Sequence, residues 1–420
     1  MSQLSDRLRQ SLLVRNTVSM FAGHMARTLI QAGYFIIIAR LLGSKGYGAF
    51  VGVAAFVAIL APFASIGSGN VMIKNVARDP QTFSRYWGNA KLITFVSGSV
   101  FSVLIILVSR FALPPSIPLV LVISITASDL IFSRVLDVSA QAFQAFEKLG
   151  RTAQLMVTLN MTRLIGAAAL LLSVKHAESA QWGFVYLTAS GISAMIALRV
   201  ANTQLGRGRR DTANMLPELR EGALFSVSLS AQSIYNDIDK TMLAKLSTLG
   251  ATGIYGAAYR IIDVAFTPVR SLLYAGYARF FQHGTKGVKG SLAFAKRLLP
   301  IAAIYALAVG GLLIVSAPLV PRLIGKDFSE SVLALRWLAF LPLLKSFHYF
   351  AADTLTGAGK QGTRSAIQAG VAVFNVGINL WLITSYSWRG AAWSSLASDG
   401  LLALTLWIVV IRIGRGRAGV

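Results

Sequence analysis

The sequence contains no cysteine, and only 13% of its 420 residues are charged. Without cysteine there are no disulfides, no thiolate metal ligands and no cysteine nucleophile. A soluble domain normally has about a quarter charged residues, whereas this chain is 55% hydrophobic, so its composition argues against a soluble fold. Acidic residues are fewer than basic ones: the sequence has 16 Asp and Glu and 40 Lys and Arg, which gives a net charge of +24.

Common enzyme motifs are also missing. The sequence has no Gly-x-x-x-x-Gly-Lys-Ser/Thr phosphate loop, no His-Glu-x-x-His zinc motif and no Gly-x-Ser-x-Gly nucleophile motif. The histidines are scattered over four regions, so their spacing predicts no metal site: His24, His176, His283 and His348. We therefore expect a protein that is not an enzyme and that holds neither a metal nor a cofactor.

Apolar residues gather in long stretches separated by short polar segments. Twelve stretches approach or exceed the roughly 20 residues that a helix needs to cross a bilayer: 12–38, 47–70, 86–110, 116–142, 152–173, 181–203, 222–244, 253–280, 293–317, 331–357, 365–386 and 390–411. No segment between them is long enough to fold as a domain. The sequence therefore predicts an all-α polytopic membrane protein with about twelve transmembrane helices, which we call spans 1 to 12.

Basic residues concentrate in every second predicted loop, as in the cluster Arg207, Arg209 and Arg210 after span 6. Because loops rich in Lys and Arg stay in the cytoplasm, this pattern predicts that both termini are cytoplasmic. No small-residue cleavage site follows the first apolar stretch, so we expect no removable signal peptide. The basic excess thus reflects membrane orientation, and we do not expect nucleic acid as a partner.

Two short motifs recur about half a chain apart. Residues 42–49 (LGSKGYGA) resemble residues 249–257 (LGATGIYGA), and residues 148–150 (KLG) resemble residues 360–362 (KQG). Both pairs place a span opposite the sixth span after it, as in transporters built from parallel repeats. The repeat predicts two lobes of six helices each: residues 1–210 and residues 211–420.

The same motifs carry a family resemblance. Arg15-Asn16-Thr17, then Ala39-Arg40-Leu41-Leu42-Gly43 with Tyr47-Gly48, resemble the start of Wzx-like O-antigen and exopolysaccharide flippases. These belong to the multidrug/oligosaccharidyl-lipid/polysaccharide (MOP) exporter superfamily. The segment 253–260 (GIYGAAYR) resembles the motif that opens the second half of that family.

The resemblance implies alternating access through a central cavity lined by spans 1, 2, 7 and 8. It implies that an undecaprenyl-diphosphate-linked oligosaccharide (an O-antigen, capsule or exopolysaccharide unit) moves from the cytoplasmic to the periplasmic leaflet of the bacterial inner membrane, without ATP hydrolysis. It further implies a monomer that works with a glycan polymerase and a chain-length regulator.

Seven basic residues lie inside the predicted spans: Arg27, Arg134, Arg163, Arg260, Arg270, Arg336 and Lys345. A charge that faces lipid at mid-membrane costs about 2.5–3.5 kcal/mol. We therefore expect most of these residues to face the protein interior or a water-filled cavity. Others can extend their charged ends to the interface, which is one interpretation of Arg163.

Polar residues at steps of three and four form stripes on spans 1, 7 and 8. Arginine binds phosphate oxygens through two parallel hydrogen bonds, and tyrosine offers both a ring face and a hydroxyl to a sugar. The predicted substrate-binding residues on spans 1 and 8 are Asn16, Arg27, Gln31, Tyr259, Arg260, Arg270, Tyr274 and Tyr277.

Some of the arginines have a structural alternative. Arg134 can pair with Asp137 or Asp129, and Arg260 can pair with Asp263 on the same helix. Arg27 and Arg270 have no obvious acid on their own face, which favours a ligand role for these two residues.

In-span acids are candidates for binding a coupling ion, either a proton or sodium. The predicted coupling residues are Asp237 and Asp263, although a structural role explains Asp237 equally well. For Asp239, a structural role such as pairing with Lys240 is favoured over ion coupling. Asp353 and Asp399 are further in-span acids of the same kind: both lie in the second half of the chain.

Two other functions fit a polytopic protein. A drug or cation antiporter of the same superfamily needs an acidic or apolar cavity, whereas the stripes here are predominantly basic. A membrane-embedded polymerase or glycosyltransferase needs a large external loop with catalytic acids or arginines, and the predicted outward loops are too short for one.

Overall fold

The computed structural model describes residues 2–211 and 215–415, without the side chains of residues 2–22, 24, 224, 225, 227–229, 231–235 and 278. Within these residues the chain is helical and contains no strand, so the all-α prediction is confirmed. The long helices are α1 (Ser2–Leu60), α3 (Phe83–Ala112), α6 (Leu149–Ser173), α7 (Ser179–Gln204), α8 (Met215–Leu246), α9 (Leu249–Gly284), α10 (Gly287–Ser316), α14 (Gln361–Tyr386) and α15 (Trp388–Arg415). Shorter helices are α2 (Ser68–Val76), α4 (Leu119–Ala127), α5 (Ser133–Ala145), α11 (Val320–Ile324), α12 (Ser331–Leu338) and α13 (Leu341–Gly357). Short 3₁₀ segments are η1 (Ala61–Ser65), η2 (Pro80–Thr82), η4 (Ala317–Leu319) and η5 (Lys326–Phe328), and a π-helical turn forms η3 (Ser128–Phe132).

Eight helical stretches of the described residues are long and apolar enough to cross a membrane, which makes this a multi-pass membrane protein. The predicted count of twelve is not confirmed. Spans 1 and 2 lie in one continuous stretch, Met25–Val76, and spans 7, 8 and 10 are helical but fall outside the eight. Spans 7 and 8 carry the densest in-span charges, which lower their hydropathy.

The chain divides into two compact units: unit 1 comprises Met1–Leu42 and Ala49–Thr241, and unit 2 comprises Gly43–Gly48 and Met242–Val420. Most of α8 thus belongs to unit 1, because the boundary between the units lies after Thr241. The predicted boundary at residue 210 placed this helix in the second lobe. The prediction of two lobes with six helices each is not tested by this division into units.

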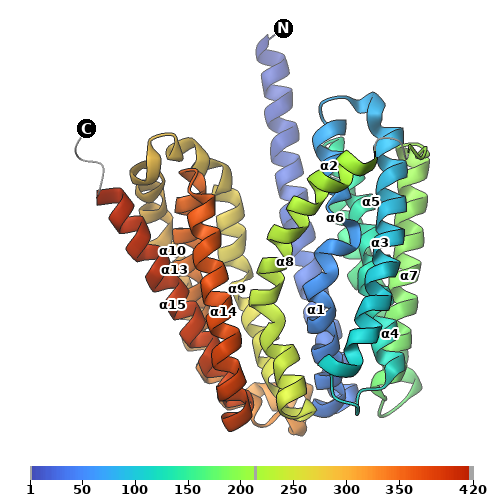
Figure 1. Cartoon of the computed structure of the whole chain (residues 1–420), viewed down its shortest axis with the longest axis vertical. Helices are drawn as coiled ribbons and strands as arrows, with labels where there is room; N and C mark the ends of the chain where they lie inside the picture. The colour runs from blue at the N-terminus through green and yellow to red at the C-terminus, as the bar shows by residue number, and fades with distance from the viewer. Residues whose placement is uncertain (1, 212–214, 416–420) are drawn as a thin grey trace. The chain divides into compact units, whose positions relative to one another are not determined.

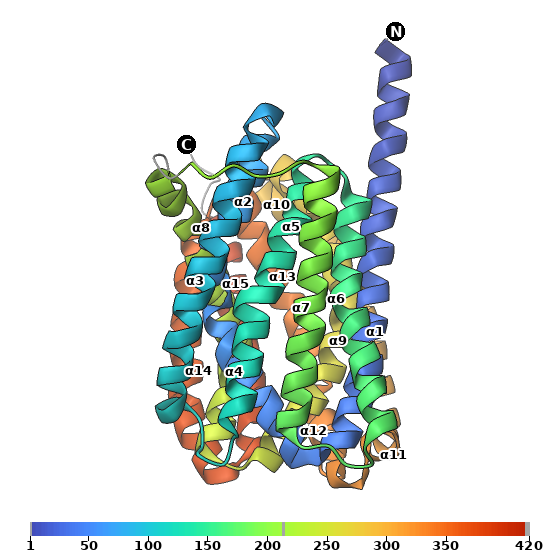
Figure 2. The same ribbon diagram turned by 90° about the vertical axis from the view of Figure 1, so that its right-hand side faces the viewer.

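In unit 1, α7 packs against α4, α5 and α6 (Figure 2). The bundle interior holds the large buried side chains Trp87, Phe143 and Trp182. Pro62 occupies an early position of the 3₁₀ turn that follows α1, and it cannot donate a backbone hydrogen bond. The carbonyls left without helical partners at this end are satisfied by α8, because Ser226 Oγ donates to the Pro62 oxygen at 2.8 Å and Ser230 Oγ donates to the Ile59 oxygen at 2.7 Å.

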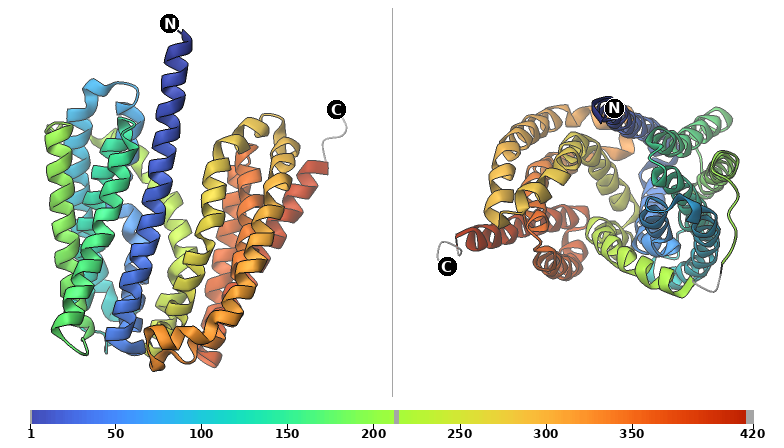
Figure 3. Two further views of the ribbon diagram at one scale, coloured as in Figure 1. Left: turned by 180° about the vertical axis from the view of Figure 1, so that it is seen from behind. Right: turned by 90° about the horizontal axis from the view of Figure 1, so that it is seen from above.

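In unit 2, α13 packs against α9, α10 and α15, and α14 packs against α15 (Figure 1). These helices are the yellow to red ribbons of Figure 3. The interior of the unit is apolar around Phe266, Phe280 and Phe350, and its polar side chains are treated below.

The two recurring glycine motifs meet inside unit 2. Gly43 has a φ of 62°, which interrupts α1 between spans 1 and 2 and suits glycine because it lacks a Cβ atom. A Cβ atom at Gly48 would collide with the carbonyl oxygen of Leu249, and one at Gly253 would collide with that of Ser44. The motifs are therefore a close helix crossing that only glycine permits at these positions.

Candidate functional site

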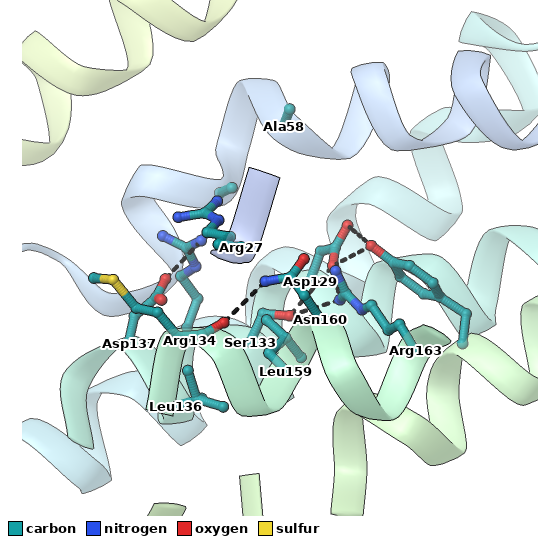
Figure 4. A pocket seen from close by; sticks show the side chains of 13 residues that line it. Arg27, Ala58, Asp129, Ser133, Arg134, Leu136, Asp137, Leu159, Asn160 and Arg163 are labelled. Atoms are coloured by element: carbon teal, nitrogen blue, oxygen red, sulfur yellow. Dashed lines mark hydrogen bonds and ion pairs between the residues drawn. The ribbon is translucent and has the colours of Figure 1, made fainter. Parts of the chain in front are cut away.

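Unit 1 contains a pocket of about 410 Å³, within the range of roughly 300–1,000 Å³ typical of small-ligand sites. Figure 4 shows its lining side chains. The pocket is lined by Arg27, Ala58, Ala61, Asp129, Ser133, Arg134, Leu136, Asp137, Met156, Leu159, Asn160, Arg163 and Tyr186. Three of the seven in-span basic residues thus line one pocket, together with two carboxylates.

Arg163 is the most buried cation of this pocket, with 7% of its surface exposed. Its Nη2 donates to Asp129 Oδ1 at 2.9 Å and to the Ser133 and Ser190 hydroxyls at 3.0 Å each. Its guanidinium carbon also lies 3.8 Å from the centroid of the Tyr186 ring. The interpretation that Arg163 extends to the membrane interface was therefore wrong, because a complete set of partners holds it inside the bundle.

The carboxylate of Asp129 owes its position to the π-helical turn η3, which lies between α4 and α5. Such a turn contains an extra residue per turn and re-aims the side chains around it. Asp129 also accepts a hydrogen bond from the Tyr186 hydroxyl at 3.0 Å. The residue pattern gave no signal for this turn, and sequence reasoning therefore missed Asp129 as the partner of Arg163 and missed Tyr186 altogether.

Arg134 and Asp137 form the second ion pair of the pocket, with Nη2 and Oδ2 2.8 Å apart at a separation of one helical turn. The structural interpretation of Arg134 is confirmed, and Asp137 rather than Asp129 is its partner. Figure 4 shows this pair on the same side of the pocket as Arg27.

Two of the predicted substrate-binding residues converge near this pocket. Arg27 lines it, and Gln31, one turn further along α1, donates from Nε2 to Asn160 Oδ1 at 2.9 Å. Asn160 was not among the predicted residues, although an asparagine within an apolar span is a recognisable signal. The predicted residue Asn16 belongs to α1, but its side chain lies outside the described residues.

A second charged cluster lies in unit 2. Asp263 Oδ1 is 3.7 Å from Arg270 Nη2 and 3.9 Å from Lys345 Nζ. The expectation that Arg270 has no acid on its own face was therefore wrong, because residues 263 and 270 are two helical turns apart on α9. Asp263 contacts Arg270 and Lys345, and its pairing with Arg260 stays a prediction.

The predicted tyrosines of α9 do not form one surface. Tyr259 is buried, and its hydroxyl accepts a hydrogen bond from Lys345 Nζ at 2.8 Å. Tyr274 is 73% exposed and Tyr277 is 42% exposed. Tyr259 therefore belongs to the interior cluster with Lys345, whereas Tyr274 and Tyr277 lie on the surface of the unit.

Most of the acidic residues considered for ion coupling form ion pairs with a lysine or an arginine. Asp237 Oδ1 is 2.9 Å from Lys240 Nζ, and Asp239 accepts the Lys240 backbone N–H at 2.7 Å. Asp353 Oδ1 accepts from Arg364 Nη1 at 3.3 Å. The coupling roles of Asp237 and Asp263 remain predictions. Among the described residues, no group of three or more His, Asp or Glu side chains could hold a metal ion.

Comparisons with known proteins agree with this architecture. Residues 13–273 match the family described as polysaccharide biosynthesis protein. An inward-facing multidrug resistance MATE family transporter of the MOP superfamily is similar in structure, with a TM-score of 0.77, 14% identity and coverage of 96% of this chain and 100% of that one. An outward-facing structure of a multidrug resistance MATE family transporter is also similar, with a TM-score of 0.61 and 16% identity. The match covers 96% of this chain and 96% of that one. A third similar structure is a MOP superfamily transporter from Pyrococcus furiosus, whose binding pocket is described as having reverse polarity. Its TM-score is 0.61 at 15% identity, and the match covers 97% of this chain and 96% of that one. No curated protein matches.

The fold is thus that of MOP superfamily transporters of the MATE type. Because the match covers more than half of its residues, the chain belongs to the polysaccharide biosynthesis protein family.

Proposed function

We propose that the protein is a flippase that moves an undecaprenyl-diphosphate-linked oligosaccharide from the cytoplasmic to the periplasmic leaflet by alternating access. The polysaccharide biosynthesis family supplies the glycan context, and the MOP fold supplies a transporter architecture. In this proposal the protein works in the bacterial inner membrane as a monomer with both termini in the cytoplasm. A glycan polymerase and a chain-length regulator act beside it.

The observation that carries the proposal is the cationic pocket of unit 1. Its lining contains three arginines against two aspartates, and each aspartate is already paired with an arginine of the pocket. The lining therefore has a net positive charge in a low-dielectric setting. A diphosphate ester is the part of the substrate that such a lining favours, and Arg27 supplies one of the three positive charges of the lining.

A drug or cation antiporter is the alternative that the fold allows, because similar structures are multidrug resistance transporters. A cationic drug would be repelled by a lining with an excess of arginine. In the MOP superfamily transporter from Pyrococcus furiosus, the reverse polarity of the binding pocket suggests a different function for that protein. The positive lining therefore favours an anionic substrate over a cationic one.

The test compares Arg27→Ala with Arg40→Ala, a variant of an exposed arginine on the same helix. In cells that lack the native gene, Arg27→Ala should reduce polysaccharide export by at least about tenfold, the equivalent of one lost charge-assisted contact of roughly 1.4 kcal/mol or more. Arg27→Lys should restore part of the loss, and Arg40→Ala should export normally. Normal export by Arg27→Ala at normal membrane levels would refute the assignment of the pocket.

A further inference from the structure

A short segment of unit 1 that follows α7 carries three exposed arginines: Arg207, Arg209 and Arg210. We call this segment, residues 205–211, the arginine strap. Figure 2 shows it crossing the end of the unit at which α7 ends. Basic residues in a connecting loop are normally part of a solvated and mobile stretch. The contacts of this segment show a different arrangement.

The backbone of the arginine strap is fixed against the start of α3. The Arg209 N–H donates to the Ser84 carbonyl oxygen at 2.8 Å, and Ser84 Oγ donates to the Arg207 oxygen at 3.2 Å. Asn89 Nδ2 donates to the Asp211 oxygen, and Asn89 Oδ1 accepts from the Asp211 N–H, both at 2.9 Å. These contacts satisfy the loop backbone without water, so the strap has a defined path.

Glycine allows this close approach of the strap to α3. A Cβ atom at Gly208 would collide with the backbone of Gly88, and a Cβ atom at Gly88 would collide with the carbonyl oxygen of Arg209. Two backbones can lie this close only where neither residue has a side chain. The guanidinium groups of the strap therefore extend from a fixed base on the surface of the unit.

The nearby acids do not neutralise the arginines of the strap. Asp211 and Glu218 both pair with Arg85 of α3, whose Nε lies 3.3 Å from Asp211 Oδ2 and whose Nη2 lies 2.8 Å from Glu218 Oε1. Among the described residues, no carboxylate forms an ion pair with an arginine of the strap. The exposed side of the strap is thus a concentrated positive charge.

Apolar side chains are exposed on the two helices next to the strap. On α7, Ile192 and Met195 are exposed, and the exposed Arg199 follows on the same helical face. On α3, Phe95 is exposed one turn further along the helix than Lys91. Both helices belong to stretches that are long and apolar enough to cross a membrane. We therefore expect these apolar residues to face acyl chains and the strap to lie at the level of the lipid headgroups.

Lys91 extends the basic surface to the junction of α3 and α7. Its Nζ lies 3.4 Å from Asn202 Oδ1 on α7 and 4.8 Å from the centroid of the Trp87 ring. Trp87 Nε1 donates to the same Asn202 oxygen at 2.9 Å, which joins the two helices at this end. The charge of Arg210 acts on Lys91 from the strap. An anion placed beside these two cations relieves their repulsion.

We propose that the arginine strap is a binding site for the headgroup of an acidic phospholipid of the surrounding leaflet. Guanidinium groups bind phosphate oxygens through paired hydrogen bonds, and the acyl chains lie along the exposed apolar residues of α3 and α7. A lipid fits better than a soluble anion, because the apolar face of α7 continues directly into its basic end. An acidic headgroup fits better than a zwitterionic one, because it leaves a net negative charge for the arginines.

The first experiment counts the lipids bound to the full-length protein in a neutral detergent by native mass spectrometry. The probes are phosphatidylglycerol, which is acidic, and phosphatidylcholine, which is zwitterionic. The test variant removes the charges of the strap and combines Arg207→Gln, Arg209→Gln and Arg210→Gln. The control variant removes the same number of charges from exposed residues of the predicted outward loops and combines Arg110→Gln, Lys175→Gln and Arg322→Gln.

We expect the strap variant to bind phosphatidylglycerol at least about tenfold more weakly than the wild type, because each basic residue near an anionic lipid surface contributes roughly fivefold. The control variant should bind it as the wild type does. An equal loss in both variants would show a diffuse effect of net charge and overturn the site. Equal affinity of the wild type for the two lipids would overturn it as well.

The second experiment keeps every charge and moves the strap. Gly208→Ala forces the strap away from Gly88, whereas Gly370→Ala on α14 is the control, because a Cβ atom there meets nothing within 4 Å. A photoreactive phosphatidylglycerol should label the strap and the adjoining ends of α3 and α7 in the wild type and in Gly370→Ala, and severalfold less in Gly208→Ala. Labelling confined to other elements, or unchanged labelling in Gly208→Ala, would contradict a fixed site.

The two experiments are independent of each other and of the proposed transport function. The arginine variant changes only exposed side chains, so the first result stands even if Gly208→Ala destabilises the fold. Neither measurement contains a lipid-linked oligosaccharide. A failure of the flippase proposal therefore leaves the lipid site intact, and the loss of the lipid site leaves the flippase proposal to its own test.

Discussion

Arg163 shows how a single charge is tolerated inside this membrane protein. One carboxylate, two hydroxyls and one aromatic ring surround its guanidinium. Each contact replaces part of the hydration that the group loses on burial. Compensated in this way, Arg163 supports the wall of the pocket, and the half-buried Arg27 adds a further positive charge to the lining.

Removal of Asp129 should therefore be far more damaging than removal of the other acid of the pocket. Asp129→Asn leaves a buried arginine without its counter-charge, which costs about 3–5 kcal/mol. Asp137→Asn breaks a pair whose side chains are 30% and 35% exposed, and we expect a cost of about 1 kcal/mol or less. Thermal unfolding of the detergent-solubilised variants measures both losses, and equal losses would contradict the burial argument.

At the scale of elements, glycine determines how helices approach one another. The crossing of Gly48 and Gly253 brings the start of α9 against the α1 segment that follows the break at Gly43. A glycine inside a helix normally weakens it relative to alanine by about 1 kcal/mol. The close backbone contact offsets that cost.

Gly48→Ala should for this reason destabilise the protein, although alanine is the better helix former. The added Cβ atom would collide with the backbone carbonyl of Leu249, and a backbone atom cannot move aside as a flexible side chain can. Gly377→Ala on α14 is the matched control, because a Cβ atom there meets nothing within 4 Å. We expect a lower unfolding temperature and a lower yield for Gly48→Ala only. A similar stability of the two variants would argue against a tight crossing.

The sequence predicted helical elements well and their exact contacts less well. Apolar length and the glycine motif were sufficient to predict the break near Gly43 and the helical character of spans 7 and 8. Local spacing also predicted the Arg134–Asp137 pair, because its partners are one helical turn apart. It could not predict the Arg163–Asp129 pair, which joins different helices and depends on the π-helical turn η3.

At the scale of the whole molecule, the charge of +24 acquires two meanings. Most basic residues lie in alternate predicted loops, a distribution that predicts an orientation with these loops beside the anionic cytoplasmic leaflet. Four of the seven basic residues inside the predicted spans lie beside acids: Arg134, Arg163, Arg270 and Lys345. On these predictions, most of the net charge relates to membrane topology, and only the charge of the pocket relates to the proposed ligand.

The orientation can be measured directly because the chain has no cysteine. Single cysteines at Lys175, between α6 and α7, and at Arg207, after α7, should be labelled from opposite sides of the membrane. We expect a membrane-impermeant maleimide to label Lys175→Cys in intact spheroplasts and to label Arg207→Cys only after permeabilisation. The reverse pattern would place both termini in the periplasm and contradict the predicted topology.

The most direct measurement of the central claim is the movement of an undecaprenyl-diphosphate-linked oligosaccharide across proteoliposomes that contain the purified full-length protein. We expect wild-type protein and Arg40→Ala to bring the oligosaccharide to the opposite leaflet, and Arg27→Ala to do so at least about tenfold more slowly. Equal movement in protein-free vesicles, or an Arg27→Ala variant as fast as wild type, would contradict a flippase that recognises its substrate through the cationic pocket of unit 1.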